Sequence, residues 1–204
     1  MTAAEVTKNL TAWREVLAAS EDSIRLAETI AWLDEHHPEV DMPARALLIC
    51  AMTSMLAATL SVESVVNDIL QSVVRDEDGT ARWEAKWTEF ERRPLKEKVQ
   101  HICESMGFAS PLGERPFLII DEMLDFRARI VHAKAELVEV QLHADEALDG
   151  KAGGHASLVT AWERACTMEN AVRFRDAARA IAYWFIVNSG GKYGPDIATI
   201  QVME

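Results

Sequence analysis

The chain has 204 residues, 49% of them hydrophobic, and a formal net charge of −12. This composition can bury one core, and no Gly-, Ser- or Pro-rich stretch is long enough to separate two domains. We therefore expect a single domain over residues 1–204. The acidic charge excludes a broadly basic surface, so any site for nucleic acid must be local.

The three cysteines, Cys50, Cys103 and Cys166, are far apart and lie in apolar helical patterns. Their arrangement predicts buried reduced thiols. Neither a Cys-x-x-Cys nor a His-Glu-x-x-His sequence occurs, so we expect no metal site. The N-terminus lacks a basic start followed by an apolar core, which favours the cytoplasm over secretion.

The first part of the chain predicts two amphipathic helices, Thr2–Ser20 and Ser20–His37. Ser20 is a suitable N-cap for the second helix, which ends before Pro38. We therefore expect an N-terminal antiparallel helical hairpin over residues 1–42.

A long third helix is predicted from Pro43 to the Asp-Glu-Asp-Gly sequence that ends at Gly79, because its apolar stripe keeps three-and-four spacing. Its run Ala46–Val62 carries no charge and is bounded by Arg45 and Glu63. The run is slightly too short for a membrane span and contains several Ser and Thr residues. We expect the central helix of a bundle, covered by its neighbours, and no contact with a membrane.

Two further helices are predicted over Ala81–Arg92 and Pro94–Met106, and Gly107 is placed to end the second. Pro116 then starts the helix that carries the most informative motif of the chain.

After that helix the pattern becomes ambiguous. Residues 137–142 alternate like a strand, whereas residues 149–154 have the composition of a loop, so we expect a mobile excursion. A last long helix is predicted over Leu158–Asn188, followed by a loose tail at residues 191–204. The chain is thus predicted to be an all-α helical bundle.

The helix that starts at Pro116 ends in Arg127-Ala-Arg-Ile-Val-His132, an Arg-x4-His hexapeptide. No other histidine has an arginine five to seven residues before it. Histidine exchanges protons near neutral pH, and arginine donates paired hydrogen bonds to phosphate groups, so Arg127 and His132 are candidate catalytic residues.

Three blocks of sequence together resemble the HEPN (higher eukaryotes and prokaryotes nucleotide-binding) domain family. Glu63 and Asn67 are similar to its Glu-x3-Asn signature, and residues 90–98 resemble its Pro-Leu-x-x-Lys connection. Residues 126–132 resemble its helix-terminal Arg-Asn-x-x-x-His. The resemblance covers roughly residues 43–190 and implies a HEPN-like helical bundle there.

The resemblance also implies a function: a metal-independent endoribonuclease, without a cofactor, whose motif lies at the interface of a homodimer. The dimer would bring two copies of His132 together, one as acid and one as base. Such proteins include toxins and phage-defence effectors, controlled by an antitoxin or another regulatory protein.

Two positions depart from the family pattern. Ala128 stands where the family usually has Asn, Asp or His, which favours an alternative function as a catalytically inactive scaffold that binds nucleotides or proteins. Lys134 stands where toxins paired with nucleotidyltransferase antitoxins carry a tyrosine, which disfavours that subclass.

Five further residues are expected to contact RNA or to support the site, namely Arg129, Lys134, Glu63, Asn67 and Asp125. Residues five apart on an ideal helix are rotated by about 140°, whereas Arg129 lies one turn before His132 on the same face. Arg127 instead aligns with an apolar stripe, where it must face a partner subunit, a buried carboxylate such as Glu63, or a cleft. Asp125 is expected to pair with Arg129 or to orient the histidine.

Other interpretations stay open. Glu63 and Asn67 could simply satisfy buried polar groups between helices. The hexapeptide could also be accidental in a helical regulator, which would place Arg127 and His132 far from any subunit interface. Ordinary solvated helix charge is expected for two other basic groups: Arg92, Arg93, Lys96 and Lys98 in the connection, and Arg173, Arg175 and Arg179 on the last helix.

Overall fold

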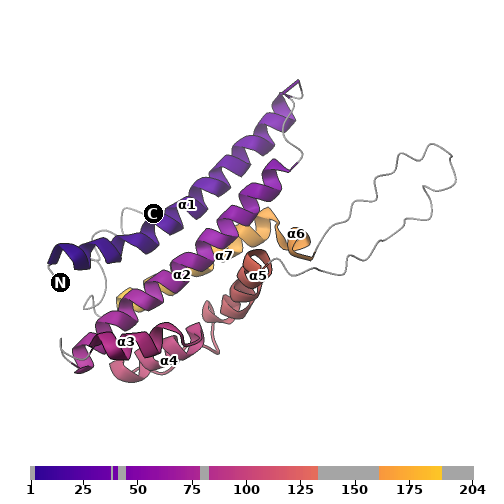
Figure 1. The fold of residues 1–204 in the computed structure, drawn as a ribbon. Helices are drawn as coiled ribbons and strands as arrows, with labels where there is room; N and C mark the ends of the chain where they lie inside the picture. Colours follow the sequence, from indigo (N-terminus) through magenta and orange to yellow (C-terminus); the bar gives the residue numbers. More distant parts are fainter. Residues whose placement is uncertain (1–2, 38, 41–44, 79–82, 133–160, 190–204) are drawn as a thin grey trace.

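A computed structural model describes residues 3–37, 39–40, 45–78, 83–132 and 161–189 (Figure 1). Within these ranges every regular element is a helix, which confirms the all-α prediction. The elements are α1 (Ala3–His36), α2 (Ala46–Asp78), α3 (Trp83–Glu91), α4 (Leu95–Met106), the 3-10 turn η1 (Phe117–Ile119), α5 (Ile120–His132), α6 (Ala161–Ala165) and α7 (Met168–Asn188).

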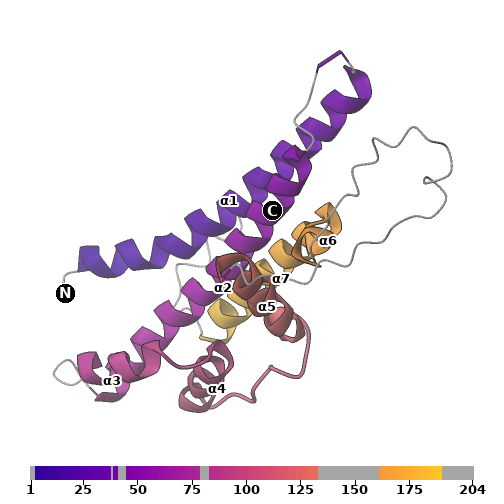
Figure 2. The same ribbon diagram turned by 45° about the vertical axis from the view of Figure 1, so that its right-hand side comes forward.

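The two longest helices, α1 and α2, lie side by side and run in opposite directions (Figures 1 and 2). The prediction of two helices before residue 42 is wrong, because α1 continues without a break from Ala3 to His36. This segment contains neither Gly nor Pro to end a helix. The hydroxyl of Ser20 does not cap a helix but forms a buried 2.8 Å hydrogen bond with the hydroxyl of Ser54 on α2. The antiparallel hairpin is therefore formed by α1 and α2.

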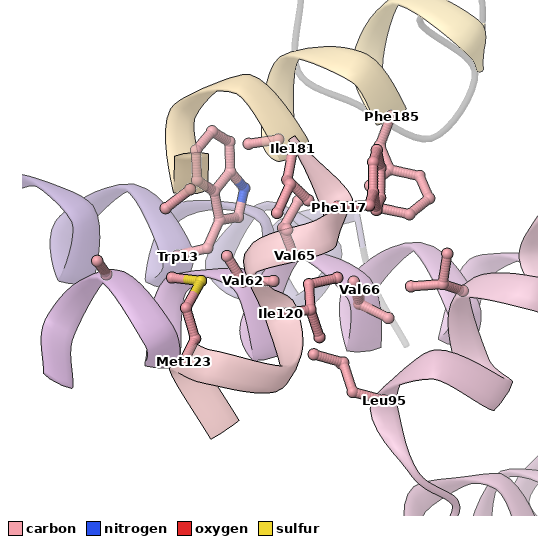
Figure 3. Close-up of a cluster of buried hydrophobic side chains, with 14 of the residues drawn as sticks. Trp13, Val62, Val65, Val66, Leu95, Phe117, Ile120, Met123, Ile181 and Phe185 are labelled. Carbon is pink, nitrogen blue, oxygen red and sulfur yellow. The ribbon is translucent and has the colours of Figure 1, made fainter. Parts of the chain in front are cut away.

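The central helix of the bundle is α2, which packs against α1, α3, α4, α5 and α7. Its apolar stripe enters one continuous core, in which Val62 and Val66 meet Ile120 and Met123 of α5, and Ile181 of α7 (Figure 3). The expectation of a covered central helix is therefore confirmed. By length and composition residues 46–75 could also cross a membrane, but half of the most apolar window is buried inside the fold. The core helix of a soluble protein meets the same criterion.

The connection between α2 and α5 consists of α3, α4 and η1. Gly107 ends α4 as predicted: its φ of 76° lies in the left-handed region, where a residue without a Cβ is least strained. The amide of Phe108 then donates to the carbonyl of Cys103 at 2.8 Å. After Pro116 the chain makes one 3-10 turn before α5 begins at Ile120.

The last predicted helix, Leu158–Asn188, is wrong in its first part. The described chain breaks between α6 and α7, where Thr167 adopts an extended conformation and its side chain accepts a hydrogen bond from the amide of Asn170. The side-chain amide of Asn170 donates to the carbonyl of Ala165 at 2.9 Å, which connects the end of α6 to the first turn of α7. A Thr that caps a new helix, rather than continuing the old one, explains the interruption. The ambiguous residues 137–142 and 149–154, and the tail, lie outside the described residues.

Candidate functional site

Arg127 lies at the boundary between α5 and α2. Ile120, Met123 and Phe126 form the buried face of α5, and Arg127 lies at the edge of that face. Its Nη1 lies 3.4 Å from Oε1 of Glu63 on α2, with 38% of the arginine side chain exposed. A partner subunit, a buried carboxylate and a cleft were the three surroundings expected for Arg127. Within the described chain it contacts the carboxylate of Glu63.

Asn67 lies one turn after Glu63 on α2 and meets Lys98 of α4. Nζ of Lys98 donates to Oδ1 of Asn67 at 2.8 Å and to the main-chain carbonyl of Glu91 at 2.9 Å. Lys98 is only 6% exposed, so the expectation of a solvated charge is wrong at this position. An ammonium group is tolerated there because two oxygens accept its hydrogens.

The spacing of α4 contained the signal for this burial. Lys98 lies three residues after Leu95 and four before Ile102, and both of these residues are buried. On a helix such positions share one face, so Lys98 belongs to the core-facing stripe of α4.

Residues from three separate blocks of the sequence, 63–67, 90–98 and 126–132, thus meet in one polar cluster. Glu63 and Asn67 come from the first block, Lys98 from the second and Arg127 from the third. We call these four residues the polar junction. It joins α2, α4 and α5, although its members are separated by up to 64 positions in the sequence (127 minus 63).

Burial and charge act against each other in the polar junction. Burial raises the pKa of Glu63, while the positive charges of Arg127 and Lys98 oppose that rise. Burial likewise lowers the pKa of Lys98, while Glu63 and the nearby Glu91 oppose that change. The two cations therefore offset part of the effect of burial, and the pKa of Glu63 stays above its ordinary value.

Two of the remaining candidates, Asp125 and Arg129, lie on the exposed side of α5. Nε of Arg129 donates to Oδ2 of Asp125 at 2.9 Å, which is one of the two roles expected for Asp125. Ala128 is exposed beside them. His132 is the last residue of α5, but its side chain, like the whole of Lys134, lies outside the part that is described.

The other basic residues are mostly engaged by carboxylates at the surface. Lys96 pairs with Asp121, and Arg93 pairs with Glu89. On α7 the pairs are Arg173 with Glu122, Arg175 with Asp176 and Arg179 with Glu21. These contacts agree with the surface charge expected for them, except that Lys96, Arg173 and Arg179 reach to other helices.

The described side chains include no group of three or more His, Cys, Asp or Glu residues that could hold a metal ion. Cys50, Cys103 and Cys166 are buried free thiols, as expected. Burial raises the pKa of Cys103 and of Cys166 to about 11, so neither is a reactive thiolate at neutral pH.

Comparison with protein-family models, with curated proteins and with solved structures found no match to this chain.

Proposed function

We propose that this chain is a HEPN-like, metal-independent endoribonuclease that acts as a homodimer in the cytoplasm. The observation that carries the proposal is the polar junction, because the arginine of the hexapeptide contacts the glutamate of the Glu-x3-Asn segment. Residues that act in one site must be neighbours in space. Arg127 and Glu63 are 64 positions apart in the sequence, so their contact does not follow from nearness along the chain. A toxin or phage-defence effector, held in check by an antitoxin or another regulatory protein, is the matching biological role.

The proposed reaction uses groups at the end of α5. The 2′-oxygen of a ribose attacks the adjacent phosphorus, and the bond from phosphorus to the 5′-oxygen of the next nucleotide breaks. His132 of one protomer takes the proton from the 2′-hydroxyl, and the second copy of His132 gives a proton to the leaving oxygen. The partly exposed guanidinium of Arg127 stabilises the charge that develops on the phosphate oxygens, with Arg129 and Lys134 in support.

A catalytically inactive HEPN-like scaffold, which dimerises and binds nucleotides or proteins, is the second candidate. The inactive scaffold is favoured because the cations near the motif are already paired with carboxylates. Arg127 pairs with Glu63, and Arg129 pairs with Asp125. A phosphate would have to compete with both carboxylates. The exposed Ala128 and the net charge of −12 point the same way.

The test incubates mixed cellular RNA in excess EDTA with the wild type, His132→Ala and His36→Ala. His36 is an exposed histidine at the end of α1 and serves as the matched control. We expect the wild type and His36→Ala to produce fragments that end in a cyclic phosphate, and His132→Ala to produce none. Arg127→Lys and Arg129→Ala then separate the two arginines.

The other outcomes distinguish the alternatives. Equal cleavage by all three proteins would show contamination or another site. If no protein cleaves RNA and light scattering shows a dimer, the inactive scaffold replaces the nuclease. If no protein cleaves RNA and the chain is monomeric, the helical regulator with an accidental hexapeptide is the better interpretation.

A further inference from the structure

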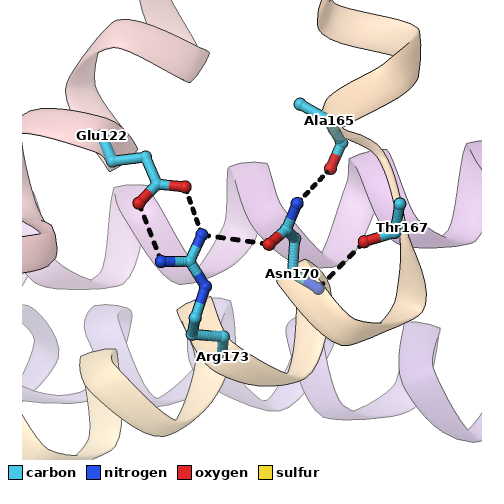
Figure 4. A network of polar contacts seen from close by, with 5 residues as sticks. All are labelled: Glu122, Ala165, Thr167, Asn170 and Arg173. Atoms are coloured by element: carbon cyan, nitrogen blue, oxygen red, sulfur yellow. Dashed lines mark hydrogen bonds and ion pairs between the residues drawn. The ribbon is translucent and has the colours of Figure 1, made fainter.

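Helix α5 is held on its α7 side by a two-pronged ion pair. In the first turn of α5, Glu122 accepts two hydrogen bonds from Arg173, one of them from Nη1 to Oε2 at 2.8 Å and the other from Nη2 to Oε1 (Figure 4). Such paired bonds between guanidinium and carboxylate fix orientation as well as distance. The contact therefore restrains the rotation of α5 as well as its separation from α7.

Arg173 is itself held in place from the start of α7. Its Nη2 also donates to Oδ1 of Asn170 at 3.0 Å. Asn170 is fixed in turn by its contacts with Ala165 and Thr167 at the break between α6 and α7 (Figure 4). The hydrogen bonds with Glu122 raise the pKa of Arg173, because they stabilise its charged form. The side chain of Arg173 is thus held in the orientation in which it binds Glu122.

The opposite side of α5 carries the contact between Arg127 and Glu63 of α2. Glu122 and Arg127 are five residues apart, which corresponds to a rotation of about 140° around an ideal helix. Between them Phe126 packs edge-on against Phe174 of α7, with ring centroids 5.9 Å apart. These two ion pairs hold α5 from two sides, beside the contact of Asp121 with Lys96 of α4, and a rotation that loosens one of the two also strains the other.

We propose that Arg173 is a positioning residue: by holding Glu122 it fixes the rotation of α5 and so keeps Arg127 beside Glu63. The consequence for RNA cleavage rests on the proposed function, because Arg127 would be the phosphate-contacting residue. The positioning itself does not rest on it, since it concerns contacts within one chain.

The pKa of Glu63, measured by NMR of the labelled side-chain carboxyl carbon, tests the proposal without RNA. Arg127 is one of the groups that oppose the raised pKa of Glu63, so the pKa must rise further if Arg127 moves away. We expect this rise in Arg173→Gln. Arg127→Gln removes the charge of Arg127 completely, so it should show the largest rise in the pKa of Glu63 that displacement of Arg127 can cause. Arg175→Gln is the matched control, because Arg175 pairs with Asp176 within α7 and should leave the pKa of Glu63 unchanged.

A double variant with reversed charges, Glu122→Arg with Arg173→Glu, should restore the wild-type pKa of Glu63. The proposal is overturned if folded Arg173→Gln keeps the wild-type pKa of Glu63, or if Arg175→Gln raises it equally. Should Arg173→Gln fail to fold, the charge-reversed variant decides: a raised pKa in that folded protein also overturns the proposal. A protein without ribonuclease activity can still pass this test, so the two proposals fail separately.

Discussion

Replacing Asp68 by Asn should stabilise the protein at neutral pH. Asp68 follows Asn67 on α2, and its Oδ2 is buried without a hydrogen-bond partner in the described structure. Burial raises the pKa of Asp68 from 3.8 to about 7. A carboxyl with a raised pKa favours folding while it is protonated, so its contribution is fully present below pH 3.8 and is lost as the pH rises through about 7. Above that range the ionised side chain opposes folding, and Asn removes this opposition.

The size of the effect follows from the same pKa. A rise from 3.8 to about 7 corresponds to about 4 kcal/mol, at ~1.36 kcal/mol per pH unit. Asp68 as a whole is only partly buried, so solvent screens its charge and we expect a gain of about 2 kcal/mol in the free energy of unfolding at pH 8. Near pH 4 the two proteins should be nearly equal, because Asp68 is then mostly protonated.

Urea unfolding at pH 4, 6 and 8 measures this gain for Asp68→Asn. Asp22→Asn is the matched control, since Asp22 is exposed on α1 and the variant makes the same change in net charge. The control should show little change at any pH. A gain for Asp68→Asn that is the same at pH 4 and pH 8, or that Asp22→Asn reproduces, would refute the assignment to a buried carboxylate.

Three other predictions concern contacts between or within helices. Lys98→Met should lower the free energy of unfolding by about 2 kcal/mol in urea, because Asn67 loses a charged donor; no loss would mean that solvent replaces the ammonium. Ser20→Ala and Ser54→Ala should each cost about 1 kcal/mol, and the double variant less than their sum, whereas additive losses would contradict a shared hydrogen bond. Thr167→Ala should cost about 1 kcal/mol in a thermal melt, and an unchanged melt would exclude the cap.

Much of the fold could be predicted because helix formation is largely a local property. The spacing of apolar residues in α2 and α4, and the glycine after α4, depend only on neighbours in the sequence. The wrong prediction of a helix start at Ser20 arose because the partner of this residue is distant in the sequence. A serine looks like an N-cap when read locally, but its hydroxyl is satisfied by Ser54, which lies 34 positions away.

Three of the four residues of the polar junction, Glu63, Asn67 and Arg127, could be predicted as candidates, but their contacts could not. Arg127 could be recognised as a charge on an apolar stripe, and that pattern required a partner for it. Glu63 was one of several partners that the sequence allowed. The burial of Lys98 was missed, because a lysine in a charged connection resembles a solvated one until its face of the helix is considered.

The sequence by itself determined that the chain is helical, which face of each main helix is apolar, and that Arg127 needs a partner. Only the tertiary structure decided that α1 is continuous, that Lys98 holds Asn67, and that Arg127 lies beside Glu63. The physical reason is the range of the interactions. Helix periodicity and capping act within one or two turns, whereas an ion pair between helices exists only after the core has set which helices lie side by side.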